Sequence, residues 1–217
     1  MPKNSPTFSD LFRRGLCTNH TGKMSGMISF STNCKSNPWC RAKAARGPEC
    51  ICAHCYAQTQ LSYQPATRAK SQRNTDLITA RRYHADEFPF INAAFFRLEA
   101  FGDLVNVDHL FNYVQLCIRN PQTIFSLYTK NYFLVRLLFD VEHVEKPKNL
   151  LVVYGSPFIN SPVSPDLVPL ADKVFTVYSK EFAQAHKIDI NCGGRRCIDC
   201  KRCYSKRTKK EVSELLK

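Results

Sequence analysis

The sequence predicts an α/β protein, built as a partial (β/α)6-type barrel or as an open parallel sheet, with a cysteine-rich metal lobe near the C-terminus. Strand-like and helical segments alternate through the middle of the chain, cysteines cluster near its end, and 217 residues suit one domain. We divide the chain into an extension at 1–26, an α/β core at 27–191 with a cysteine-rich loop at 34–55, and a cysteine-rich segment with a basic tail at 192–217.

Six segments have the composition of strands, with β-branched and aromatic residues bounded by polar ones. They lie at 27–33, 95–101, 123–129, 149–154, 173–178 and 188–191. Residues 107–120 carry apolar side chains at helical spacing and end at Pro121, which indicates a helix. Further helices are expected at 64–87, 131–141 and 182–187, and a proline-rich connection at 156–169. This alternation favours parallel strands joined by crossovers.

Polar residues follow the predicted strands, where a site would form. Glu99 and Asp103 follow the second strand and Lys130 follows the third. The carboxyl ends of parallel strands meet at one edge, so we expect these three residues and both cysteine clusters to converge there. They are the candidate catalytic or substrate-contacting residues. Arg97 shares a strand face with Glu99 and is expected to pair with it, so it receives no role.

The net charge of +13 is concentrated in two segments. Residues 35–82 hold nine Lys or Arg and two acids, residues 193–217 hold nine and three, and the rest of the chain sums to zero. A nucleic-acid footprint, compensation of metal-bound thiolates and recruitment of an anionic substrate all fit. No apolar run is long enough to span a membrane, and no signal peptide is evident. We therefore expect a cytoplasmic protein with reduced thiols and no membrane partner.

The C-terminal cysteines form a ligand pattern. Cys192, Cys197, Cys200 and Cys203 are separated by four, two and two residues. Such short intervals allow several thiolates to face one centre, and the last two resemble ferredoxin spacing more than zinc-ribbon spacing. We expect an iron–sulfur cluster there, with zinc as the alternative.

The loop at 34–55 holds five cysteines, more than one metal centre needs. Cys52 and Cys55 form a chelating pair. The spacing alone does not decide whether Cys50 or Cys52 binds alongside Cys55, and the roles of Cys34 and Cys50 stay open.

Several short blocks of this chain resemble the phage gene product 88 family, which has no established biochemical activity. The blocks are Asn37-Pro38-Trp39-Cys40, Cys52-Ala53-His54-Cys55-Tyr56-Ala57, Phe101-Gly102-Asp103-Leu104, Tyr128-Thr129-Lys130-Asn131 and the region from Asn191-Cys192-Gly193-Gly194 to Cys203-Tyr204. The resemblance runs over residues 27–204 and implies a phage-derived protein of the host cytosol. Matching its motif points to Cys40, Cys52 and Cys55 as the N-terminal trio.

The chain is more distantly similar to radical S-adenosylmethionine enzymes, whose three cluster-binding cysteines also follow the first strand. In those enzymes, three cysteines hold a 4Fe-4S cluster whose open iron binds the cofactor. The spacing departs from theirs, because eleven residues separate Cys40 from Cys52, and only the interval from Cys52 to Cys55 agrees. A glycine-rich cofactor motif after the second strand is also poorly matched.

Two functions follow from these patterns. The first is an enzyme with one or two 4Fe-4S clusters that binds S-adenosylmethionine and acts on a nucleotide or nucleic acid. The second is a zinc-stapled nucleic-acid-binding protein without catalysis. In the second, basic residues of the tail contact phosphates and three tyrosines stack on bases, namely Tyr56, Tyr63 and Tyr204. The metal content distinguishes the two.

Overall fold

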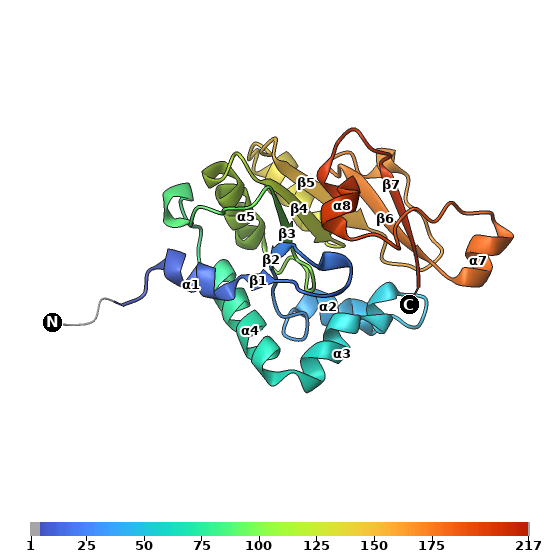
Figure 1. The fold of residues 1–217 in the computed structure, drawn as a ribbon, viewed down its shortest axis with the longest axis horizontal. Helices are drawn as coiled ribbons and strands as arrows, with labels where there is room; N and C mark the ends of the chain where they lie inside the picture. The colour runs from blue at the N-terminus through green and yellow to red at the C-terminus, as the bar shows by residue number, and fades with distance from the viewer. Residues whose placement is uncertain (1–4, 217) are drawn as a thin grey trace.

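The computed structural model describes residues 5–216, which fold around one seven-stranded sheet (Figure 1). The strands are β1 Cys17–Thr18, β2 Ile28–Phe30, β3 Phe95–Leu98, β4 Ile124–Thr129, β5 Leu150–Gly155, β6 Lys173–Tyr178 and β7 Glu211–Leu215. They lie side by side in this order, with β1 antiparallel to β2 and every later pair parallel. The predicted α/β class and parallel sheet are therefore confirmed, and β1 and β7 form the sheet's two edges.

The described residues form eight α-helices. They are α1 Phe8–Gly15, α2 Pro38–Ala44, α3 Tyr56–Tyr63, α4 Pro65–Thr79, α5 Val107–Arg119, α6 Tyr132–Arg136, α7 Lys180–Ala185 and α8 Cys197–Cys200. Short 3-10 turns are η1 Gly22–Met24, η2 Ile51–His54, η3 Ala85–Glu87, η5 Pro165–Leu167 and η6 Arg202–Tyr204, and η4 Leu137–Val141 is π-helical. No helix within residues 5–216 is long and apolar enough to cross a membrane.

Helices cover one face of the sheet and enclose the main core. Phe96, Phe125 and Val152 of the central strands are fully buried in one cluster with Leu110 and Val114 of α5. Parallel strands in sequential order with right-handed crossovers place all connecting helices on the same side. The central strands consequently alternate between a helix-covered face and an opposite face.

The C-terminal cysteine lobe, residues 192–204, packs on that opposite face, and α8 lies in front of the strands in Figure 1. Tyr204 contacts Phe95 edge-to-face with ring centroids 5.3 Å apart, and the Tyr128 hydroxyl lies 2.7 Å from Cys203 Sγ. Phe95 and Tyr128 belong to β3 and β4, so the lobe crosses the middle of the sheet. The expectation that it would sit with the N-terminal cysteines at the strand ends was wrong.

The predicted last strand at 188–191 was also wrong, because that segment is irregular. The sixth parallel strand is β7, which lies inside the basic tail. Val212 is buried there, and the ammonium of Lys173 on β6 donates to Thr208 O, Thr208 Oγ1 and Lys209 O at 2.7, 2.8 and 3.0 Å. These bonds fix the tail where β7 begins.

Candidate metal centres

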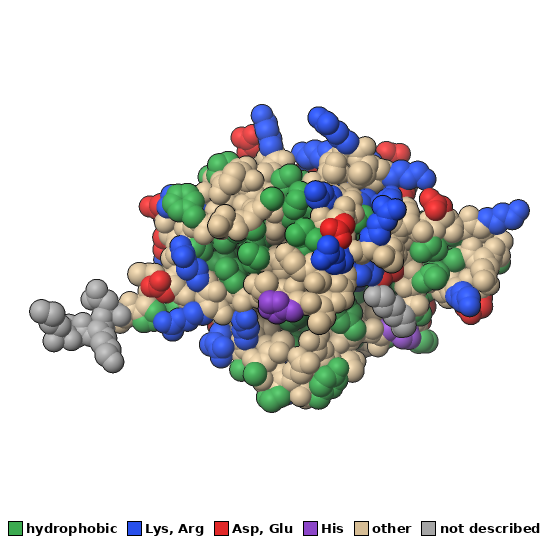
Figure 2. Space-filling view, in the orientation of Figure 1, with side chains coloured by type: hydrophobic (Ala, Val, Ile, Leu, Met, Phe, Trp, Pro, Cys, Tyr) green, Lys and Arg blue, Asp and Glu red, His purple; other side chains and the backbone are tan. Residues whose placement is uncertain are grey.

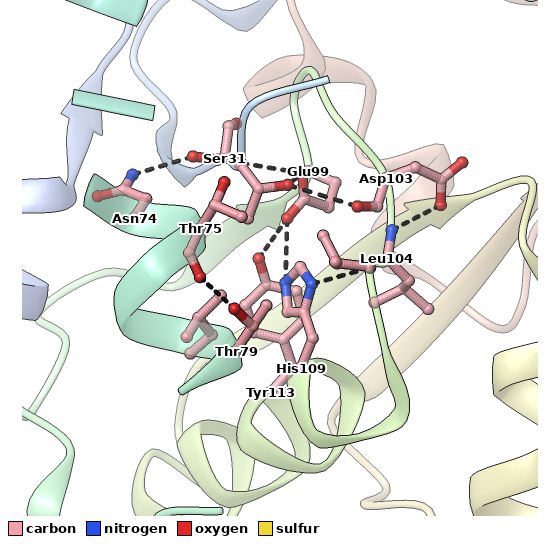
Figure 3. A network of polar contacts seen from close by, with 12 residues as sticks. Ser31, Asn74, Thr75, Thr79, Glu99, Asp103, Leu104, His109 and Tyr113 are labelled. Carbon is pink, nitrogen blue, oxygen red and sulfur yellow. Dashed lines mark hydrogen bonds and ion pairs between the residues drawn. The ribbon is translucent and has the colours of Figure 1, made fainter. Parts of the chain in front are cut away.

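Strand β2 leads into the N-terminal cysteine loop, and polar residues of α4 fix the start of that loop (Figure 3). Asn74 Nδ2 donates to Gly15 O at 3.1 Å and to Ser31 O at 2.9 Å, and the Asn33 N–H donates to Thr75 Oγ1 at 2.9 Å. Asn74 and Thr75 are buried although polar, because they satisfy backbone groups that would otherwise lack partners. Helix α4, which has few apolar side chains, thus buries a face of polar side chains that form hydrogen bonds.

Four cysteines of this loop interact with one another. Cys34 donates a hydrogen bond to Cys55, and Cys40 interacts electrostatically with Cys52 and Cys55. Cys34 and Cys40 are buried with two apolar side chains of α3. The structure thus brings the predicted trio into one region and adds Cys34 to it. We call these four residues, Cys34, Cys40, Cys52 and Cys55, the N-terminal cysteine group.

One member of the N-terminal cysteine group differs from the others in charge. The pKa of Cys55 is lowered to about 6, because the Cys34 thiol and two backbone N–H groups at the start of α3 donate to its sulfur. Burial raises the pKa of Cys40 above its usual range and that of Cys52 to about 12. Without a metal, Cys55 is therefore the thiolate of the group at neutral pH.

Cys50 lies next to the group but is held differently. Its side chain is fully buried, and its backbone forms an isolated bridge with Phe158. It still contributes to the raised pKa of Cys52, so its thiol is within electrostatic reach. Cys34 and Cys50 are both neighbours of the trio rather than isolated extra cysteines.

Lys130 and Asp103 border the same thiols. Burial lowers the pKa of the Lys130 ammonium, but its electrostatic interactions with Cys52, Asp103 and Cys55 outweigh that effect and the pKa is raised. The side chain passes over Gly155, with Cγ 3.3 Å from where a Cβ would stand. Asp103 is buried, and it accepts from the Thr129 hydroxyl at 2.5 Å and from the Lys130 N–H at 2.9 Å. Asp103 thus holds the backbone from which Lys130 projects.

Glu99 lies deeper than predicted, in the polar network of Figure 3, and its side chain has no exposed surface. One oxygen accepts from the Tyr113 hydroxyl at 2.5 Å and lies 3.3 Å from His109 Nε2. The other accepts from the Thr32 N–H at 3.1 Å and hydroxyl at 3.0 Å. Glu99 therefore ties β2 to α5, and its predicted contact with a ligand stays a prediction.

Arg97 does not pair with Glu99, so that expectation was wrong. Glu99 has a positive φ of 55°, which turns its side chain away from the face that Arg97 occupies. Arg97 instead lies over the Tyr128 ring, with Cζ 3.2 Å from the ring centroid. Strand register places Ser29 and Ser126 on either side of it, and these small residues leave room for the guanidinium.

The C-terminal cysteines surround a cavity of about 40 Å³, which Tyr128, Lys23 and Tyr204 also line. That exceeds the ~10–15 Å³ that one water molecule needs. The Lys23 ammonium lies 3.5 Å from Cys192 Sγ and forms an ion pair with Glu214. Lys201, with a positive φ of 54°, turns the chain between Cys200 and Cys203. Burial raises the pKa of the Cys192, Cys197 and Cys203 thiols.

Basic side chains border this cavity. Arg195, Lys201 and Arg202 line it, and Figure 2 shows Lys and Arg side chains gathered around α8 and β7. Part of the positive charge of the tail therefore lies around the C-terminal cysteines. Tyr204 is only 3% exposed, so its predicted stacking on a base was wrong, whereas Tyr56 and Tyr63 are 65% and 67% exposed.

Both cysteine regions contain buried donors that have no protein partner. Near the N-terminal cysteine group, Trp39 Nε1 has no acceptor. Near the C-terminal cysteines, two guanidinium nitrogens of Arg97 and Nε of Arg202 have none among residues 5–216. Buried N–H and O–H groups normally have acceptors, and thiolate or sulfide sulfurs would supply them. The donor set and the orphaned groups therefore fit an anionic metal–thiolate centre in both regions.

The side chains do not form a finished coordination sphere. Across residues 5–216, no three His, Cys, Asp or Glu side chains make a group that could hold a metal ion as they stand. Binding a metal would require the sulfurs to move closer together, and both predicted ligand sets stay predictions.

These features define a class: a mixed α/β protein with a mostly parallel sheet, one cysteine loop after its first parallel strand and a cysteine lobe on its face. The chain belongs to the gene product 88 family, whose profile matches residues 12–206 and so includes both cysteine regions. The family resemblance seen in the sequence is confirmed. No curated protein and no solved structure shows a significant match.

Sequence reasoning missed several neighbours of the cysteines. Lys23 comes from the N-terminal extension, Tyr128 from the middle of β4, and Trp39 from the turn that begins α2. Trp39 and Tyr128 carried a signal, because both stand in blocks that resemble the family. Lys23 approaches through long-range packing, which local spacing does not reveal.

Proposed function

We propose that this chain is an iron–sulfur protein related to radical S-adenosylmethionine enzymes, acting on an anionic nucleotide or nucleic acid. The observation that carries the proposal is the pairing of each cysteine region with buried hydrogen-bond donors that lack protein acceptors. The sequential order of the parallel strands, with connecting helices on one face, supports the partial (β/α)6-type arrangement of that enzyme class.

Cys40, Cys52 and Cys55 would hold a 4Fe-4S cluster with one iron left open. Cys34 lies beside them and would compete as a fourth thiol ligand. When bound, such a cluster supplies an open iron for S-adenosylmethionine and the electron that cleaves it. Lys130 is the cation beside this group and would bind a carboxylate or phosphate of the cofactor or substrate. Asp103 positions Lys130 through its backbone.

The C-terminal cysteines would hold a second cluster with a structural or electron-relay role. Tyr56 supports a connection between the two regions. Its hydroxyl donates to Ala100 O at 2.5 Å, and its electrostatic partners include Arg97 on one side and Cys55 and Lys130 on the other. The Tyr56 side chain thus lies within electrostatic reach of Arg97 and of the N-terminal cysteine group.

The test is metal and acid-labile sulfide analysis of protein purified without oxygen. About seven to eight irons with matching sulfide would support two clusters, and S-adenosylmethionine binding would then be measured by calorimetry. We expect Cys52→Ser with Cys55→Ser to remove about half of the iron and all cofactor binding. Cys17→Ser is the matched control, because Cys17 lies on β1 outside both cysteine regions. Zinc without sulfide, after attempted reconstitution, would refute the proposal.

A second candidate is a zinc-stapled nucleic-acid-binding protein, and one observation favours it. An open hollow of about 370 Å³ is lined by Lys148, Lys206 and Arg207 together with Asn149. Fluorescence anisotropy with a single-stranded oligonucleotide would test it across a salt series. Binding through these cations predicts a slope of log K against log salt near −0.7 for each phosphate contacted. Lys206→Glu with Arg207→Glu should make that slope shallower, and salt-independent binding would exclude this reading.

A further inference from the structure

Arg97 is a buried cation whose hydrogen-bonding groups are incompletely used. Its Nε and Nη1 are buried without any hydrogen-bond partner, and its Cζ lies 3.2 Å from the ring centroid of Tyr128. A cation removed from water is strongly destabilising unless an anion or several acceptors replace the water. The Tyr128 ring supplies only part of that compensation. The position therefore calls for an anion.

Among residues 5–216, no Asp or Glu side chain forms an ion pair with Arg97. Glu99 turns to the other side of the sheet, where Tyr113 and His109 contact it. The groups that act most strongly on Arg97 are the phenols Tyr128 and Tyr204 and the thiols of Cys203 and Cys197. Of these, the thiols are the ones that become anionic when they bind a metal.

We propose that Arg97 is the internal counter-ion of an anionic metal–thiolate centre formed by Cys192, Cys197, Cys200 and Cys203, and that it makes this centre easier to reduce. This inference rests on the metal assignment of the proposed function. Four thiolates around Zn²⁺ or a 4Fe-4S core carry about −2. A neighbouring positive charge stabilises that anion, and it stabilises the reduced form, with one more negative charge, even further.

Two other cations beside these cysteines, Lys23 and Lys201, are less suited to this role. Lys23 already pairs with Glu214, and Lys201 is exposed to solvent, where salt screens its charge. Arg97 projects from the middle of β3, fixed between Ser29 and Ser126 of the neighbouring strands. The Tyr128 hydroxyl that lies 2.7 Å from Cys203 Sγ acts in the same direction, because a donated hydrogen bond stabilises a thiolate.

The test compares Arg97→Met with the wild-type chain and with Arg119→Met. Arg119 is a matched control, because its Cζ lies 3.9 Å from the centroid of Phe90 and its Nε is also buried without a partner, but it stands at the end of α5. All three proteins carry Cys40→Ser, Cys52→Ser and Cys55→Ser, so that only the C-terminal cysteines remain as a predicted ligand set. The metal-free proteins are titrated with Co²⁺ in competition with a chelator.

We expect Arg97→Met to weaken Co²⁺ binding at least tenfold, while Arg119→Met stays within twofold of the wild type. Without metal, Arg97→Met should melt at the same temperature as the wild type or higher, because a buried unpaired charge is gone. A purely structural role would lower both quantities together. Arg97→Lys keeps the charge and should recover part of the affinity. Equal Co²⁺ affinity for Arg97→Met and wild type would overturn the proposal.

The redox part uses the same variants after reconstitution with iron and sulfide, titrated with a chemical reductant. We expect the reduction equilibrium of Arg97→Met to shift at least tenfold toward the oxidised form, which corresponds to 59 mV for one electron. An unchanged midpoint would overturn the tuning role. Tight Co²⁺ binding without iron and sulfide uptake would instead refute the iron–sulfur assignment while leaving Arg97 as the counter-ion.

Discussion

Gly102 allows us to test the network that joins β2, β3 and α5 at the N-terminal cysteine loop. It has a φ of +100°, and a Cβ added there would meet Glu99 Oε2 and would lie 2.7 Å from Thr32 O and 2.8 Å from Thr32 Oγ1. Both neighbours belong to the buried network and neither is the free end of a flexible chain. We therefore expect Gly102→Ala to displace the Glu99 carboxylate.

The free energy of unfolding should fall through two effects. A non-glycine residue at positive φ costs about 1–2 kcal/mol. Moving Glu99 breaks its two hydrogen bonds from Thr32, each worth about 1.5–3 kcal/mol because the acceptor is charged. The loss should be at least about 4 kcal/mol, close to the whole stability of a marginal domain.

Urea denaturation followed by circular dichroism measures this loss, with Gly22→Ala as the control. Gly22 has a φ of +64° but has no atom within 4 Å of an added Cβ, so it reports the backbone effect alone. Should Gly102→Ala not fold, Thr32→Val removes only the hydroxyl bond and should lose about 1.5–3 kcal/mol. Equal losses in Gly102→Ala and Gly22→Ala would refute the reasoning.

Four more outcomes are expected. In metal-free protein, Cys34→Ala should raise the pH of half-maximal Cys55 alkylation from about 6, because the Cys55 thiolate loses its main hydrogen-bond donor. Mass spectrometry measures the alkylated fraction at each pH. An unchanged midpoint would argue against the hydrogen bond from Cys34 to Cys55. The Cys55 pKa is lowered on folding, so its stabilising effect should be fully present in alkaline solution and disappear as the pH falls through about 6. Tyr113→Phe should lower the free energy of unfolding by about 1.5–3 kcal/mol through the lost bond to Glu99, and no change in urea would contradict that bond. Lys173→Met should release the start of β7, so limited proteolysis should cut the tail faster than in wild type.

The sequence predicted the central strands and one helix closely. Residues 107–120 form α5 Val107–Arg119, because their apolar stripe and the following proline are local signals of a helix and of its end. Residues 173–178 became β6 with the same bounds. The predicted helix at 64–87 was too long instead, because α4 Pro65–Thr79 ends eight residues earlier and only the short turn η3 Ala85–Glu87 follows within that range.

The failures share a physical cause. Strand β7 mixes charged, polar and apolar residues behind a run of Lys and Arg, and its partner β6 is over thirty residues away in sequence. Nothing local distinguishes it from a solvated tail. The same holds for the candidate site. Residue spacing identified both cysteine regions, but the positions of Arg97, Lys23 and Cys34 depend on which strand faces and loops pack together in the folded chain.

If the C-terminal cysteines bind a metal as proposed, the position of their lobe within the crossover from β6 to β7 would couple metal occupancy to the sheet edge. Parallel neighbours need a long connection, and here the connection carries the four C-terminal cysteines and packs on the sheet. A metal that binds the ordered lobe and not the unfolded chain adds RT ln(1 + [L]/Kd) to the stability of everything that unfolds with it. Hydrogen exchange of the β7 amides would then slow as the lobe is loaded, although β7 contains no cysteine. The edge strand thus becomes a thermodynamic reporter of a centre that it does not ligate.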